Sequence, residues 1–129
     1  MYSCTIRPRF NETDALGHIS NTVLPSWFES ARAPLFEDII PSWTIANWPI
    51  ILAHFEVDFL QQIFLGADVT ITTQIQKVGN ASFTVYHEAF QSDKKVASGN
   101  AVLVFFDFKT QKTTAIPDDI RAILESNLG

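Results

Sequence analysis

Cysteine is nearly absent from this sequence, with Cys4 the only one in 129 residues. A single cysteine permits neither an intramolecular disulfide nor a cysteine metal cluster, which excludes the disulfide-rich secreted scaffolds and the cysteine-based zinc modules. The plain interpretation is a reducing, cytoplasmic setting.

Long apolar runs and an excess of basic charge are missing as well. No stretch approaches the ~20 apolar residues that a membrane-spanning helix needs, and the N-terminal segment MYSCTIRPRF lacks the apolar core of a signal peptide. Nine Lys and Arg stand against 14 Asp and Glu, so the net charge is −5, whereas a nucleic-acid-binding surface would need a basic stripe. We therefore expect no nucleic-acid and no membrane partner. A phosphorylated ligand, which needs only a few local cations, stays open.

Apolar and aromatic side chains, by contrast, are plentiful. Hydrophobic residues make up 47% of the chain and charged residues 18%, so the chain can bury a core and should not be disordered. Its length is typical of one domain, which we expect to span residues 1–129.

One segment has the apolar spacing of a helix. From about Thr22 the apolar residues recur at i, i+3, i+4 and i+7, which predicts an amphipathic helix with one buried face. Pro25 is tolerated only in the first turn, where N–H groups have no intrahelical partner, and this favours an N-cap at Asn21 or Thr22. Pro34 should end or kink the helix. The apolar positions are Leu24, Trp27, Phe28, Ala31 and Leu35.

The rest of the chain alternates with a period of two, which predicts half-buried antiparallel strands over residues 53–59, 69–76 and 82–89. The segment NAVLVFFDF is apolar on both faces and is expected to be a central strand, and Pro117 begins a last helix. We therefore predict an α+β fold, with an antiparallel sheet of about five strands wrapped around one long helix, plus a short C-terminal helix. The single long helix alone should cover one sheet face, and the apolar surface left over favours self-association.

The stretch TDALGHISN places an acid just ahead of the helix N-terminus. Free N–H groups at a helix start can hold an oxyanion, and the same positive end favours the ionised form of Asp14. Gly17 would let the backbone approach a ligand. Spacing alone favours a plain helix-entry loop, because such loops are common.

The ordered motif RFNETDALGHISN, followed by WFESAR, resembles the 4-hydroxybenzoyl-CoA thioesterase-like family, whose members have the hotdog fold. The later segments VDFLQQIFLGADVTITTQI, GNASF and GNAVLVFFDFKTQKTTAIPDDIRAIL resemble the rest of that family, so the similarity extends over essentially the whole chain. The matching residues are Arg9, Glu12, Asp14, Gly17, His18, Ile19, Asn21, Glu29, Ala31 and Arg32.

The resemblance implies hydrolysis of acyl-CoA, or of an acyl-carrier protein thioester, to the free acid without a cofactor. Asp14 falls on the catalytic carboxylate, as nucleophile or general base, and the backbone N–H near Asn21 falls on the oxyanion donor. His18 falls on a supporting position. Family members dimerise side by side into one sheet, so a homodimer or homotetramer is expected.

The chain departs from the family pattern where the helix begins. Ser20 stands where an asparagine is common and Leu24 where a tyrosine is common, and Pro25 is unusual there. We expect Leu24 and Pro25, together with Gly17 and Trp48, to shape the acyl pocket.

Other functions stay open. A hotdog enoyl-CoA hydratase or dehydratase also uses an acid and a histidine, but the Asn-Pro that usually lies between them is missing. A non-catalytic acyl-CoA or acyl-carrier binding module is the third possibility. His54, Glu56 and Asp58 share a strand face, for which a solvated surface is favoured over a metal site, and His87 is expected to be a satisfied core or cleft histidine.

Overall fold

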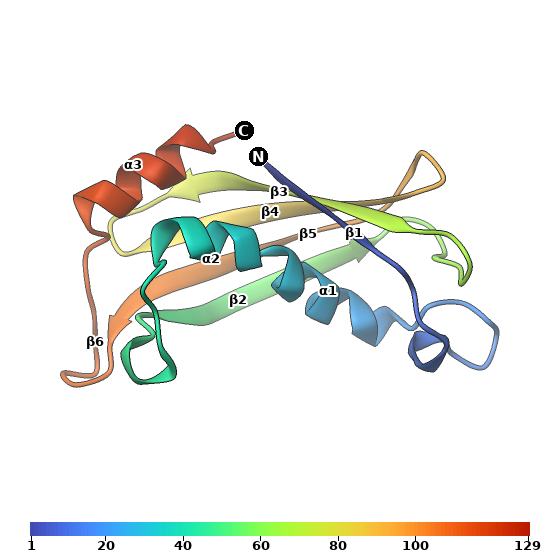
Figure 1. Cartoon of the computed structure of the whole chain (residues 1–129), viewed down its shortest axis with the longest axis horizontal. Helices are drawn as coiled ribbons and strands as arrows, with labels where there is room; N and C mark the ends of the chain where they lie inside the picture. Colours follow the sequence, from blue (N-terminus) through green and yellow to red (C-terminus); the bar gives the residue numbers. More distant parts are fainter.

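The computed structural model describes residues 1–129. It is built on a six-stranded antiparallel sheet in which five strands follow the order β1-β3-β4-β5-β2 and β6 pairs with β5 (Figure 1). This confirms the predicted α+β architecture. The strands are β1 (Tyr2–Ile6), β2 (Ile50–Phe59), β3 (Val69–Val78), β4 (Ser82–Gln91), β5 (Lys94–Asp107) and β6 (Lys112–Thr113).

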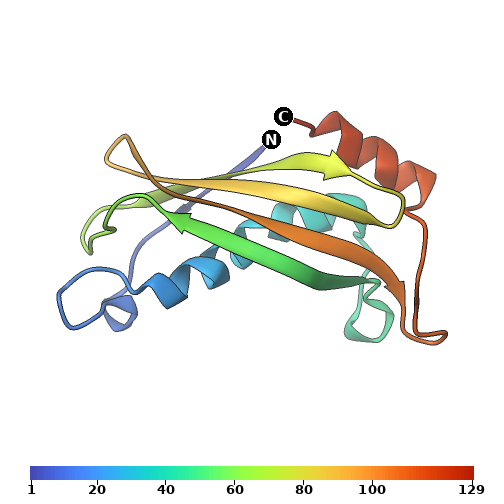
Figure 2. The ribbon, with the colours of Figure 1, turned by 180° about the vertical axis from the view of Figure 1, so that it is seen from behind.

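Two helices, α1 (Leu24–Ala31) and α2 (Ala33–Ile39), run end to end along one face of the sheet. Arg32 is the junction between them, and Pro34 lies in the first turn of α2, so the predicted interruption near Pro34 is confirmed. Figure 2 shows the opposite face of the sheet, over which no helix passes. No helix of the structure has the length and apolar character needed to cross a bilayer.

The start of the long helix differs from the prediction. A 3-10 turn, η2 (Asn21–Val23), precedes α1, and Oγ of Ser20 accepts a hydrogen bond of 3.4 Å from the Thr22 N–H. The side-chain cap is therefore Ser20 and not Asn21 or Thr22, because the extra turn moves the helix start toward the N-terminus. Two further 3-10 turns are η1 (Phe10–Glu12) and η3 (Ile45–Asn47).

The alternation predicted for β3 and β4 is confirmed, because every second side chain of these strands is buried beneath the helices. The buried side chains form two clusters, one under α1 and one under α2. The second cluster includes Ile120 and Leu124 of α3 (Asp118–Ser126), so α3 shares the covering of this face and the expectation that one helix covers it alone was wrong. The amphipathic spacing of these two residues allows α3 to close the end of the sheet.

Strand β2 also differs from the prediction, because it is an edge strand and most of it is exposed. Its register with β5 shifts between Leu52 and His54, so Ala53 lies in a bulge and has no partner in β5. Phe55 and Phe59 face the helix side of the sheet but remain 50% and 45% exposed. The period-two pattern therefore identified the strand but not its position at the edge.

Gly99 of β5 determines how closely α1 approaches the sheet. A Cβ at this position would lie 2.6 Å from the carbonyl oxygen of Glu56 and 2.9 Å from the ring of Phe28. Glycine is required here because it leaves space for the aromatic ring on the sheet.

Candidate active site

Asp14 lies in a small hairpin in which Thr13 opposes Ile19 and the Asp14 N–H donates to the His18 carbonyl at 2.7 Å. Gly17 closes the turn with φ of +79°, a conformation that favours glycine. Oδ1 of Asp14 accepts hydrogen bonds from the N–H groups of Leu16 and His18, at 2.8 and 3.2 Å. The side chain is exposed, and none of these bonds uses Oδ2, so one carboxylate oxygen positions the loop and the other is available for chemistry.

His18 supports Asp14 through its main chain. Its N–H and C=O both bond to Asp14, while its imidazole packs edge-on against Phe64 with ring centroids 5.0 Å apart. The buried side chain of Gln91 holds this partner segment, accepting from the Phe64 N–H at 2.9 Å and donating to the carbonyls of Phe64 and Ala67. The position of His18 thus depends on a glutamine that sequence analysis did not single out.

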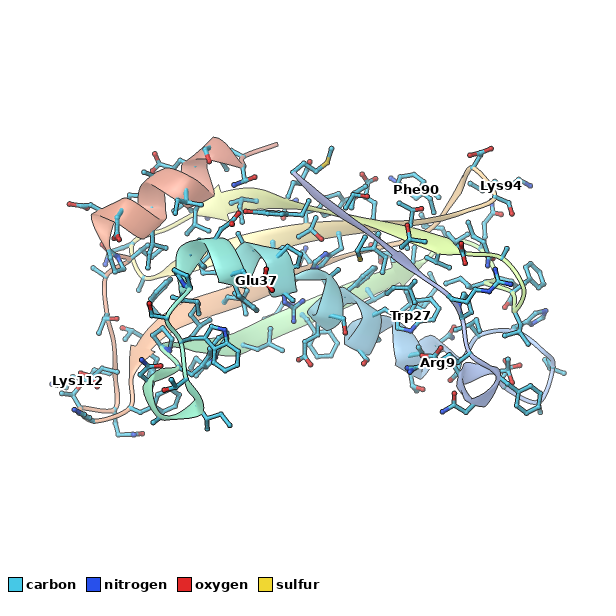
Figure 3. The ribbon with its side chains drawn as sticks, in the orientation of Figure 1. Arg9, Trp27, Glu37, Phe90, Lys94 and Lys112 are labelled. Atoms are coloured by element: carbon cyan, nitrogen blue, oxygen red, sulfur yellow. The ribbon has the colours of Figure 1, made fainter.

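Glu12 connects the loop to the helix. Its buried carboxylate accepts hydrogen bonds of 2.8 Å from Nε1 of Trp27 and from the backbone N–H of Arg9, and Figure 3 shows Arg9 and Trp27 close together at this end of α1. Burial opposes ionisation of Glu12, but the hydrogen bonds from Arg9 and Trp27 outweigh it and hold the pKa below its ordinary value. Glu12 was noted in the sequence only as a family match.

The same residue fixes the start of the helix. The Ser20 N–H donates to the Glu12 carbonyl at 2.8 Å, and Asn21 follows as the first residue of η2. The N–H of a first helical residue has no intrahelical acceptor, so the amide of Asn21 is oriented by the turn and remains free to donate. Asp14 and Asn21 are both exposed and both belong to segments that Glu12 holds.

Two adjoining hollows lie between the helix and β2. The first, of about 130 Å³, is lined on the helix side by Pro25, Phe28, Glu29 and Arg32. The second, of about 250 Å³, includes Trp48 and shares Glu29, Arg32 and Leu52 with the first. Of the residues expected to shape the acyl pocket, Pro25 and Trp48 therefore lie in these walls.

The other expected residues lie elsewhere. Leu24 is 1% exposed and belongs to the core under α1. Gly17 lies at the tip of the hairpin, and neither it nor Asp14 nor His18 contributes to the walls of the two hollows. The candidate site therefore consists of two separate parts. One is the exposed loop that carries the Asp14 carboxylate, and the other is the groove between the helix and β2.

A buried polar chain borders the groove. Arg32 lies 3.4 Å from Nε2 of His87, whose Nδ1 lies 3.0 Å from Oγ1 of Thr73. Burial, and then the charge of Arg32, lower the pKa of His87 to about 3, so its imidazole is neutral near pH 7. Because arginine has no acceptor, Nε2 accepts from Arg32 and Nδ1 carries the proton. His87 is thus a satisfied buried histidine, as predicted, and its apolar strand face was the signal.

His54, Glu56 and Asp58 lie on the outer face at the sheet edge, and all three are exposed. Glu56 accepts a hydrogen bond from the Asn100 side chain at 3.1 Å. No group of three or more histidine, cysteine, aspartate or glutamate side chains is arranged to hold a metal ion. Three exposed side chains on one strand face are typical of a solvated surface, the interpretation that the sequence favours over a metal site.

A family model described as the thioesterase-like superfamily matches residues 8–124. Among solved structures, one described as a predicted thioesterase from Bacillus stearothermophilus is 39% identical, with a TM-score of 0.95 over 99% of this chain and 96% of that one. A thioesterase from Thermus thermophilus, complexed with coenzyme A and Zn, is 29% identical, with a TM-score of 0.87 over 97% and 92% of the two chains. A 1,4-dihydroxy-2-naphthoyl-CoA hydrolase from Nostoc punctiforme is 29% identical over 98% of this chain and 86% of its own length.

Proposed function

The chain belongs to the thioesterase-like superfamily and is a thioester hydrolase, and from this premise we propose that it hydrolyses acyl-CoA with Asp14 as its catalytic carboxylate. The predicted thioesterase identity and hotdog fold are thereby confirmed. The observation that carries the proposal is the Asp14 carboxylate, of which only one oxygen accepts hydrogen bonds. Its Oδ1 accepts from the N–H groups of Leu16 and His18, its Oδ2 takes part in neither bond, and the residue is exposed.

The chemistry requires a group that adds oxygen to the thioester carbon and a donor that stabilises the resulting oxyanion. Asp14 supplies the first function, either by attacking the carbonyl itself or by taking a proton from the attacking water. The N–H of Asn21, at the start of η2, donates to the carbonyl oxygen. If Asp14 acts as the base, water adds to the carbonyl carbon, the C–S bond breaks, the proton taken by Asp14 passes to the coenzyme A thiolate, and the acyl group leaves as the acid. If Asp14 attacks, breakage of the C–S bond leaves the acyl group on Asp14 as a mixed anhydride, which a water then hydrolyses to the acid and free Asp14.

Coenzyme A as the carrier is supported by two of the similar proteins. The Nostoc punctiforme relative is named as the hydrolase of a CoA thioester, and the Thermus thermophilus structure contains coenzyme A. The acyl group would lie in the hollows between α1 and β2, which begin at Pro25, one helical turn beyond Asn21. An acyl-carrier protein thioester is the alternative donor of the same acyl group.

We propose that the working form is a homodimer joined through β2. This ten-residue edge strand has no neighbour on its outer side, and Leu52, Phe55 and Phe59 are 42–50% exposed along it. A long apolar edge is normally covered in a folded protein, and an antiparallel copy of the same strand would extend the sheet across the dimer. The hollows border this edge, so the partner would also close them.

A thiol-release screen over a panel of aliphatic and aromatic acyl-CoAs tests the proposed function. We expect release of free coenzyme A from at least one member at a rate well above the uncatalysed one. Hydration of crotonyl-CoA without thiol release would favour the hydratase instead. Tight binding across the panel without turnover would favour a binding module.

A further inference from the structure

Gln91 holds the segment between β2 and β3 with its side-chain amide. It is the last residue of β4 and is 5% exposed, and its Oε1 accepts a hydrogen bond of 2.9 Å from the Phe64 N–H. Its Nε2 donates to the carbonyls of Phe64 and Ala67, at 2.8 and 2.9 Å. Both amide N–H donors and the amide oxygen are therefore used, and the side chain bonds the N–H and the C=O of Phe64 as a neighbouring strand would.

Burial does little to fix this segment. Of residues 60–67 only Ile63 is buried, and Phe64 is 51% exposed. The three bonds of Gln91 are the only side-chain hydrogen bonds made to residues 60–67. A segment with so few buried apolar contacts has low local stability, so its position depends on the glutamine amide.

The same segment supports the hairpin that carries Asp14. The Ile19 N–H donates to the Ile63 carbonyl at 2.8 Å, and His18 and Phe64 form an antiparallel bridge. The rings of His18 and Phe64 also pack edge to face, with centroids 5.0 Å apart. The hairpin therefore rests on the part of the chain that the glutamine amide holds.

His18 passes this support to the carboxylate. Its N–H donates to Oδ1 of Asp14 at 3.2 Å, and its carbonyl accepts from the Asp14 N–H at 2.7 Å. From this chain of contacts we infer that Gln91 is a positioning residue for the reaction, which orients Asp14 through residues 60–67 and His18. The inference rests on the proposed catalytic role of Asp14 and adds the residue that holds this carboxylate in place.

Gln91 acts on the carboxylate and not on the groove. Neither Gln91 nor any of residues 60–67 lines the two hollows between α1 and β2. Loss of the amide should therefore lower kcat and leave KM nearly unchanged, because the orientation of the reacting group changes while the acyl-binding walls stay the same.

The test is a double-mutant cycle between Gln91→Met and Asp14→Asn, with kcat and KM measured on the best substrate of the acyl-CoA screen. Methionine keeps an unbranched side chain and removes the amide. We expect Gln91→Met to lower kcat roughly 10- to 100-fold in the wild-type background, since a misplacement of about 1 Å can cost about 100-fold. In the Asp14→Asn background the same change should cost less than about 3-fold, because a residue that acts through Asp14 has nothing left to position. KM should change less than about 3-fold in both backgrounds.

Leu124→Val is the control for a general loss of stability. Leu124 is fully buried in α3, which lies at the end of the sheet opposite the Asp14 hairpin (Figure 1), so the variant loses core packing and should keep kcat. Gln91→Asn keeps the amide on a side chain one carbon shorter and should retain more of kcat than Gln91→Met. It takes the place of Gln91→Met in the cycle if the methionine variant does not fold.

A wild-type kcat for Gln91→Met overturns the inference, and so do equal losses of kcat in the two backgrounds or a change confined to KM. Failure of both Gln91 variants to fold overturns it as well, since this marks a structural glutamine. If the wild type releases no thiol, or if Asp14→Asn keeps the wild-type kcat, the proposed function fails instead. Amide hydrogen exchange of Ile19 then decides whether Gln91 holds the hairpin. We expect exchange roughly 10-fold faster in Gln91→Met than in Leu124→Val, and equal rates overturn the inference.

Discussion

Trp27 donates a hydrogen bond of 2.8 Å from its indole Nε1 to Oε2 of Glu12, and this bond joins the helix to the loop that carries Asp14. The two residues are 15 positions apart and both are buried. Because the main chain of Glu12 also accepts from Ser20, one residue fixes the loop and the helix start relative to each other. The relative placement of Asp14 and Asn21 therefore depends on this contact.

Trp27→Phe keeps the aromatic bulk and removes the donor to the buried carboxylate. We expect the free energy of unfolding to fall by about 1.5–3 kcal/mol, the range for a hydrogen bond to a charged group, together with a loss of kcat. Urea unfolding at pH 7.5 measures the change. Trp43→Phe alters a half-exposed indole and serves as the control. Equal stability of the two variants would show that the bond to Glu12 contributes nothing.

His87 makes the folded state sensitive to acid. Its pKa is about 3 in the folded protein, against about 6.5 in an unfolded chain, so the unfolded state binds a proton first as the pH falls. Stability from this group is complete above pH 6.5 and is lost progressively from there to about pH 3. Between pH 7.5 and pH 5 the expected loss is about 2 kcal/mol, which depends only on the unfolded pKa because the folded histidine stays neutral throughout.

Urea unfolding of the wild type and of His87→Gln at both pH values checks this. Glutamine is polar but does not titrate, so the variant should be less stable at pH 7.5 and should lose less on acidification. Parallel losses in the two proteins would mean that His87 takes up its proton over the same pH range in the folded and the unfolded state.

Much of the fold could be predicted because its signals are local. The helical spacing from Leu24 to Leu35, the interruption near Pro34 and the alternation of β3 and β4 depend on a residue and its near neighbours. The position of β2 at the edge could not be derived in this way. Alternation reports that a strand has two different faces, but the number of neighbours that flank a strand is decided by chain topology.

The candidate site shows the same contrast between local contacts, which the sequence predicts, and long-range contacts, which it does not. Asp14, Gly17 and His18 form one short motif, and their mutual contacts are local hydrogen bonds of a turn. The contact between Arg32 and His87 joins residues 55 positions apart, and only the packing of the helix on β4 creates it. Gln91 was missed for the same reason, because its partners lie 24 and 27 residues away.

Ala53→Pro tests the proposed dimer. Ala53 has no partner in β5, and proline is tolerated at bulges of edge strands, so the protomer should still fold. A proline on this edge interferes with the approach of a second β2 strand and lacks an N–H to donate. We expect sedimentation to show a dimer for the wild type and for Ala53→Val, and mainly monomer for Ala53→Pro. A monomeric wild type at micromolar concentration would contradict the proposal.

Hydrolysis by Asp14→Asn tests the central claim most directly. The asparagine oxygen can still accept from Leu16 and His18, so the loop should keep its shape while the charge and the basic oxygen are lost. With the best substrate of the acyl-CoA screen, we expect kcat to fall roughly 100- to 10,000-fold, the usual contribution of a positioned acid or base. Asp68→Asn, a matched change at an exposed aspartate, should retain kcat, and both variants should unfold at the wild-type urea concentration. An Asp14→Asn enzyme with the kcat of the wild type would show that the catalytic carboxylate lies elsewhere.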